Sequence, residues 1–297
     1  MRAGGFGQTG PAVAMMIGSC ASLQVGAVLA ARLFPTAGAM GATLLRLALA
    51  ALVLLVITRP RLRGWSATQW RAAVLFGLCL AGMNGFFYAA IDRIPLGVAV
   101  TVEFLGPLTL AALLSRRVGD LAWILLAAVG VAVLGRPGEE TGLDPLGIAF
   151  ALVAGVFWAL YVLAGAKAAA APGRGGLVVA MGVAAVVVLP LGAHGAGLAL
   201  AEPRLVLVAF GAAVLASVVP YTLQLSALRR LSAPVFGVLL SLEPAVATLA
   251  GWLLLSQDVG PVAVAAIAVV VLAGVGSTVS AGPRRVDTGT DRYRPEA

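Results

Sequence analysis

The chain of 297 residues is 61% hydrophobic and only 11% charged, and its mean hydropathy is +1.04. A soluble globular domain carries about 25% charged residues, so this composition excludes a water-soluble fold. The net charge of +8 does not indicate nucleic-acid binding, because the basic residues lie in short clusters between apolar segments and form no continuous basic surface.

Ten apolar segments, separated by Pro, Gly and charged residues, follow one another along the chain. They span residues 11–33, 38–58, 71–91, 95–115 and 120–135 in the first half, and 146–168, 177–192, 205–225, 234–254 and 261–280 in the second. A helix needs about 20 apolar residues to cross the ~30 Å hydrocarbon core of a bilayer. The segments do not alternate in polarity as membrane β-strands do. The sequence therefore predicts an all-α integral membrane protein with ten transmembrane helices.

Short segments flank and join the predicted helices. We expect residues 1–10 to form an N-terminal tail, residues 136–145 a periplasmic linker, and residues 281–297 a disordered basic tail. Cys20 and Cys79 lie in apolar segments without CxxC spacing, which indicates buried thiols rather than a disulfide or metal site. The only histidine, His194, falls in a predicted outer loop and cannot by itself form a paired metal or haem site. We expect no cofactor and no metal.

The distribution of basic residues predicts the orientation in the membrane. Ten spans place both termini on one side, and fifteen of the 20 basic residues then fall on that side. Four fall on the other side, and Arg46 lies within a span. Because cytoplasmic loops carry an excess of Lys and Arg, we expect both termini in the cytoplasm.

The two halves of the chain resemble each other at an offset of 137 residues. At this offset Arg93 matches Arg230 and Pro107 matches Pro244. With five spans in each copy, the second copy enters the membrane upside down, which is the inverted-repeat plan of many secondary transporters. We therefore expect one repeat in residues 11–135 and a second in residues 146–280, with a binding site between them near mid-membrane.

Two carboxylates, Glu103 and Glu243, lie near the middle of predicted spans. An ionised side chain there costs about 2.5–3.5 kcal/mol on insertion scales, so such groups normally face a cavity. Each precedes a proline, Pro107 or Pro244, and we expect both spans to kink because proline removes a backbone hydrogen bond. The pair could be protonated groups that hold helices together, or a site for a substrate ammonium or a proton.

Further polar residues lie inside predicted spans. Arg46 cannot lose its charge, so it must snorkel to the interface, meet a carboxylate such as Glu103 or Glu243, or hold an anionic substrate group. Polar and aromatic residues share helix faces in spans one, three, six and eight: Gln24; Asn84 and Tyr88; Trp158 and Tyr161; Ser217, Tyr221 and Gln224. A single such residue commonly forms a hydrogen bond between helices, but polar faces on four helices favour a shared cavity.

Several functional motifs are missing from the sequence. No GxxxxGK[ST] phosphate loop and no HExxH zinc motif occur, and no histidine lies in a predicted span. A P-loop ATPase is therefore excluded and an enzyme is disfavoured, although a lipid-modifying enzyme and a non-transporting membrane scaffold stay as alternatives.

Several short motifs carry a resemblance to a known protein family. They are Ser22-Leu23-Gln24, Leu45-Arg46-Leu47, Gly82-Met83-Asn84 to Tyr88, Ile94 to Val100, Glu103-Phe104-Leu105-Gly106-Pro107, Phe236-Gly237 and Ser241-Leu242-Glu243-Pro244. Over about residues 12–280 the sequence resembles the bacterial threonine and homoserine exporters of the EamA branch of the drug/metabolite transporter superfamily. The resemblance implies ten helices in two inverted five-helix repeats, in the bacterial inner membrane, and a central cavity lined by helices one, three, four, six, eight and nine.

The resemblance and the residues together predict a secondary exporter of small amino acids of the threonine or homoserine type. Sister groups resemble exporters of aromatic amino acids or other metabolites, so these substrates are an alternative. We expect a monomer in membrane lipid that binds a small amino acid, with a proton as candidate coupling ion. The candidate substrate-binding residues are Gln24, Arg46, Asn84, Tyr88, Glu103, Trp158, Tyr161, Tyr221 and Glu243.

Overall fold

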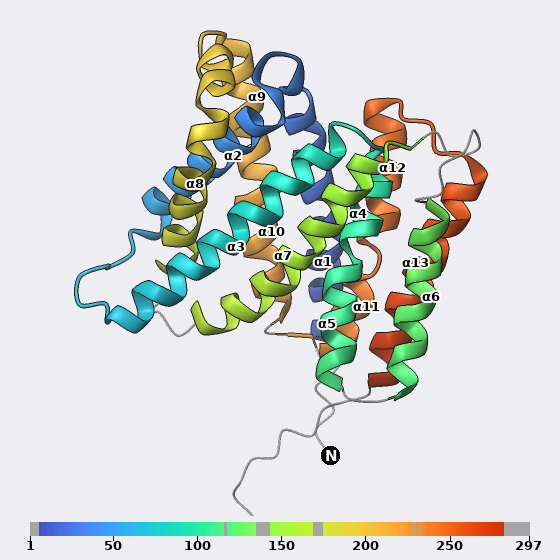
Figure 1. Cartoon of the computed structure of the whole chain (residues 1–297). Coiled ribbons are helices and arrows are strands. Elements are labelled where there is room, and N and C mark those ends of the chain that lie inside the picture. Colours follow the sequence, from blue (N-terminus) through green and yellow to red (C-terminus); the bar gives the residue numbers. More distant parts are fainter. Residues whose placement is uncertain are drawn as a thin grey trace, which may run out of the picture.

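The computed structural model describes residues 6–115, 118–134, 143–168, 175–228, 230–231 and 233–281, and these residues form a bundle of helices (Figure 1). The helices are α1 (Phe6–Ala31), α2 (Phe34–Thr58), α3 (Ala67–Ile91), α4 (Leu96–Glu103), α5 (Leu105–Ser115), α6 (Val118–Leu134), α7 (Pro145–Ala168), α8 (Gly175–Leu200), α9 (Pro203–Ala213), the π-helix η1 (Val214–Val218), α10 (Val219–Leu228), α11 (Ala233–Leu240), α12 (Glu243–Leu255) and α13 (Pro261–Ala281). Within these residues there is no strand.

Nine helical stretches in the described residues are long and apolar enough to cross a membrane. The stretch Leu96–Leu114 combines α4 and α5, Pro203–Gln224 combines α9, η1 and α10, and Val235–Leu255 combines α11 and α12. The fifth predicted span is the shorter helix α6, of 17 residues, at the lower limit of the ~17–25 residues that can span a bilayer. An all-α, multi-pass membrane protein is thereby confirmed.

Successive spans run in alternating directions between two ends of the bundle (Figure 1). We call the end at which α1 begins the near end; there the chain passes from α2 to α3 and from α7 to α8. At the opposite, far end it passes from α1 to α2, from α3 to α4 and from α12 to α13. The most extensive helix pairings are α2 with α8, α3 with α7, α3 with α8 and α6 with α13, so the two halves of the chain are packed together.

Three helices extend beyond the boundaries expected from the sequence. The helix α1 begins at Phe6, within the predicted tail, and α13 continues to Ala281. The helix α8 continues to Leu200, so the exposed His194 lies in a helix and not in a loop. The glycines around it do not form a turn, because Gly192 and Gly195 let α8 approach the backbone of α2, where a Cβ would collide with the carbonyl of Met40 or Ala37. The predicted linker and basic tail fall largely on residues 135–142 and 282–297, outside the described residues.

Both spans that carry a mid-membrane glutamate are interrupted, as predicted. The first breaks at Phe104, directly after Glu103, and the second breaks at residues 241–242, directly before Glu243. Pro107 has no N–H to donate to the carbonyl of Glu103, which is one reason for the first break. That carbonyl lies 2.6 Å from where a Cβ of Gly155 would be, so only glycine fits in the facing turn of α7. The breaks leave a helix end beside each carboxylate.

Candidate functional site

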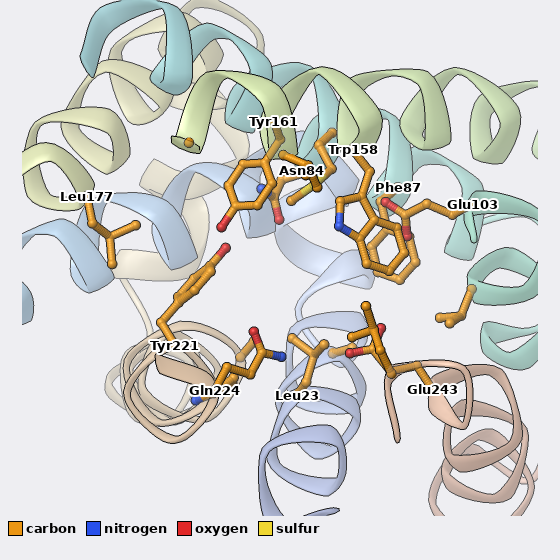
Figure 2. Close-up of a pocket in the computed structure, with 18 of the residues that line it drawn as sticks. Leu23, Asn84, Phe87, Glu103, Trp158, Tyr161, Leu177, Tyr221, Gln224 and Glu243 are labelled. Carbon is orange, nitrogen blue, oxygen red and sulfur yellow. The ribbon is translucent and has the colours of Figure 1, made fainter. Parts of the chain in front are cut away.

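A cavity of about 980 Å³ lies at the centre of the bundle, and Figure 2 shows many of its side chains. All nine candidate residues contribute to its lining: Gln24, Arg46, Asn84, Tyr88, Glu103, Trp158, Tyr161, Tyr221 and Glu243. They come from α1, α2, α3, α4, α7, α10 and α12. Residues spread over 220 positions of sequence thus share one space, in the size range of small-molecule sites (~300–1,000 Å³).

The helices of the cavity include those that the resemblance implied, and two more. The helix α2 contributes Arg46 and Leu54, and the start of α8 contributes Gly176 and Leu177. The lining extends to the near end, because Leu54 and Gly176 both lie within about a turn of a helix terminus there. Towards the far end, Tyr88 is 2% exposed and packs edge-on against Phe34, with ring centroids 6.0 Å apart. The cavity therefore reaches the near end and is closed towards the far end.

Arg46 is a buried cation in the wall of this cavity, only 3% exposed. Its Nη1 donates to Ser217 Oγ at 2.9 Å, its Nη2 donates to Asn84 Oδ1, and its guanidinium carbon lies 5.1 Å from the ring centroid of Tyr88. Asn84 is oriented for this role because its Nδ2 donates to the carbonyl of Leu80 at 2.8 Å. Arg46 does not snorkel, since it is buried in the middle of α2.

The charge of Arg46 is not neutralised by a carboxylate. Among the described residues the structure contains one ion pair, between Arg93 and Asp144, and Arg46 forms none with Glu103 or Glu243. The buried Nε of Arg46 also lacks a hydrogen-bond partner. A buried charge without a counter-ion and with unused donors is costly, so this arrangement is suited to receive an anion.

Glu103 and Glu243 lie on one side of the cavity, with Trp158 between them and the tyrosines in the view of Figure 2. Their side chains are 7% and 3% exposed. Glu243 is in the first turn of α12, where the positive end of the helix dipole favours a negative charge. Its Oε1 is 4.0 Å from the thiol of Cys20, which is buried as predicted. The pair supplies acceptors for a cation or a proton.

Aromatic side chains form the other side of the cavity. The hydroxyls of Tyr161 and Tyr221 point towards one another in Figure 2. Tyr161 stacks on Phe76, with centroids 4.7 Å apart, and Trp158 meets Phe104 edge-on at 6.1 Å. Aromatic walls around a few convergent polar groups are typical of small-molecule sites.

Sequence reasoning missed part of this site. Ser217 was recognised only as a member of a polar stripe, although it holds Arg46. Phe76, Met83 and Phe87 also line the cavity, but apolar residues in apolar spans carry no signal that distinguishes lining from lipid contact. Among the described residues, no group of three or more His, Cys, Asp or Glu side chains could hold a metal ion.

Comparisons with known proteins agree with this architecture. The profile of the EamA-like transporter family matches residues 145–279. The threonine/homoserine exporter RhtA of Escherichia coli (strain K12) is 38% identical over 269 residues, which cover 90% of this chain and 91% of that protein. The chain belongs to the EamA-like transporter family. RhtA of Salmonella typhimurium (strain LT2) is likewise 38% identical, over 271 residues, or 91% of this chain and 92% of the relative.

The EamA-like fold is also found in a solved structure. Among the solved structures that match, a crystal structure has a TM-score of 0.52 and 20% sequence identity, over 89% of this chain and 96% of the matched chain. At this identity the likeness shows the shared fold alone. The predicted membership of the drug/metabolite transporter superfamily is thus confirmed by sequence, and the structural match extends over nearly the whole helical bundle.

Proposed function

We propose that this EamA-like protein exports small zwitterionic amino acids of the threonine and homoserine type across a bacterial inner membrane. The observation that carries the proposal is the central cavity, in which an arginine without a counter-ion and two carboxylates face one space. Relatives at 38% identity over nine-tenths of the chain are named threonine/homoserine exporters. A zwitterion supplies both a carboxylate and an ammonium, which together match this charge pattern.

The polar groups of the cavity suggest a division of roles. Arg46, held by Asn84 and Ser217, binds the substrate carboxylate through charge-assisted hydrogen bonds. Glu103 and Glu243 receive the ammonium or a proton. Because the walls are aromatic and apolar, these few groups fix the orientation of the substrate while the remaining contacts fill space.

Alternating access between two inverted repeats, residues 11–135 and 146–280, completes the mechanism. The helix pairings support this organisation. Counterparts in the two halves pack on each other, as in α2 with α8 and α6 with α13, and the contact of α3 with α7 is repeated by that of α10 with α1. Contacts that recur when the two halves of the chain are interchanged are expected when one repeat rocks against an inverted copy.

The orientation of the protein follows from its charges. Arg59, Arg61 and Arg63 lie in the near-end connection between α2 and α3, and Arg71 lies in the first turns of α3. Under the positive-inside rule the near end is cytoplasmic. The cavity, which reaches the near end and is closed at the far end, then represents a state that loads substrate from the cytoplasm.

The test is flux in proteoliposomes loaded with labelled threonine, with a panel of unlabelled amino acids as competitors. We expect threonine and homoserine to be exported and to compete with each other, and tryptophan to compete less. Dominant tryptophan efflux would assign the protein to the aromatic exporters, an alternative that the aromatic walls also fit. Absence of flux for every amino acid would favour a scaffold and contradict the proposal.

A further inference from the structure

The eighth membrane span contains a π-helical turn, η1, between α9 and α10. The N–H of Val219 donates to the carbonyl of Val214, five residues earlier, instead of the usual four. Pro220 follows at once and has no N–H to continue the ladder of hydrogen bonds. Isolated π-helical turns are rare and occur frequently at functional sites.

The π-helical turn is held in place by one face of α1. Ser22 Oγ donates to the carbonyl of Leu215 at 2.8 Å, and Ser19 Oγ donates to that of Pro220 at 3.3 Å. Gly26 packs so closely on the backbone of Ala216 that a Cβ would collide with it. Three residues of α1, about one turn apart, thus pack on the irregular backbone, and Ser22 satisfies the Leu215 carbonyl that the π-helical turn and Pro220 leave without a backbone donor.

The side chain that this turn presents is Ser217, which is fully buried. Its Oγ accepts a hydrogen bond from Nη1 of Arg46, while Asn84 accepts one from Nη2. Each acceptor holds a different nitrogen, so together they fix the plane of the guanidinium above Tyr88. Both acceptors are neutral, and therefore they orient the cation without cancelling its charge.

We infer that Ser217, held by η1 and α1, is a positioning residue that selects substrates with a carboxylate by fixing the guanidinium of Arg46. This inference deepens the proposed function and rests on it. Without Ser217, Arg46 keeps its charge but can rotate away from the substrate. The loss then falls on recognition of the carboxylate, whereas a structural role would affect all solutes alike.

Ser217→Ala tests the inference in proteoliposomes with threonine as substrate and threoninamide, which lacks the carboxylate, as competitor. We expect KM for threonine to rise about tenfold with little change in maximal rate, and the preference for threonine over threoninamide to fall by a similar factor. The matched control is Ser226→Ala, because Ser226 Oγ donates only to the carbonyl of Thr222 in the same helix. That variant should keep the parental KM for threonine and the parental preference for threonine over threoninamide.

Ser22→Ala provides a second test, which applies even if Ser217→Ala does not fold. It removes the hydrogen bond to the π-helical turn without changing a residue of the cavity lining. We expect the same loss of preference at a smaller magnitude, about threefold. Normal threonine flux with an unchanged preference in these variants would overturn the inference alone. Absence of amino-acid flux in the parent would instead overturn the proposed function.

Discussion

Three charged side chains dominate the chemistry of the cavity at the scale of single residues. Arg46, Glu103 and Glu243 are all more than nine-tenths buried, yet no ion pair joins the arginine to either glutamate. Apposed opposite charges would neutralise one another and leave little to attract a substrate. Kept apart in one cavity, they remain available to the two charged ends of a zwitterion.

Glu103→Gln and Glu243→Gln keep the shape and most of the hydrogen bonding of the glutamates but remove the charge. If the carboxylates bind an ammonium or a proton, we expect at least one variant to be monodisperse in detergent and to transport at least tenfold more slowly, a loss of ~1.4 kcal/mol in transition-state stabilisation. Threonine flux at pH 6 to 8 is the measurement. Parental flux in both variants would show that the glutamates serve only to hold helices together.

Close helix approach, made possible by small residues, is the dominant feature at the scale of elements. Among the helix pairs, α2 and α8 have the most extensive contact, and Gly41, Gly192 and Gly195 lie where their backbones meet. In lipid, packing of this kind replaces the hydrophobic driving force between helices. It also holds α2, and with it Arg46, at a defined position beside the cavity.

Gly195→Ala tests this packing. Its Cβ would collide with the carbonyl of Ala37, so we expect α8 to be pushed from α2 and the melting temperature in detergent to fall by several degrees. Gly197→Ala is the matched control in the same helix, because a Cβ there meets nothing within 4 Å. Alanine is the better helix former, so the control should be neutral or slightly stabilised. Equal melting temperatures for both variants would contradict the role of Gly195.

At the scale of the whole molecule, contacts between interhelical segments that are distant in sequence hold the far end of the bundle together. Arg93 Nη1 lies 2.9 Å from Asp144 Oδ2, and the amide of Leu96 donates to Gln257 Oε1 at 3.0 Å. The hydrogen bond from Arg93 lowers the pKa of Asp144. The stability that this ion pair contributes is thus present above the unfolded pKa of Asp144 and is lost as pH falls through the lower, folded value.

Asp144→Asn removes the ion pair that ties the start of α7 to the connection before α4. Because the pair is exposed to solvent its contribution is small, so we expect a normal fold and a modest shift towards the outward-open state. In a variant lacking Cys20 and Cys79, a cysteine at Ala27 in the cavity should react up to about fivefold faster with an impermeant reagent added outside. The charge swap Arg93→Asp with Asp144→Arg should restore slow labelling. Unchanged labelling in Asp144→Asn would exclude the pair as a gate.

Orientation is a property of the whole molecule that labelling can measure directly. In the same cysteine-free background, cysteine at Arg63 in the near-end loop should be protected from an impermeant reagent in intact cells. Cysteine at Arg204, at the start of α9 on the far end, should be labelled. Labelling at position 63 from outside would reverse the orientation and the direction in which the cavity is open.

The sequence by itself determined the membrane location, the all-helical class, the two broken spans and the candidate residues of the cavity. These follow from local physics: hydrocarbon admits only apolar helices, proline removes a hydrogen bond from the turn that precedes it, and buried charges in lipid normally face a cavity. Such constraints act within one span, so they can be read from that span alone.

Only the tertiary structure decided which groups meet. The partners of Arg46 proved to be Asn84 and Ser217 rather than a glutamate, and His194 proved to lie in a helix. Both outcomes depend on contacts between different spans. The glycines near His194 favour a loop when only their own segment is considered, but in the fold they allow α8 to pack closely on α2. Ser217 is typical of a residue that joins helices by a hydrogen bond, and only the fold shows that η1 directs it towards Arg46. Contacts over 38 and 171 positions of sequence are set by how helices pack, which composition and periodicity do not specify.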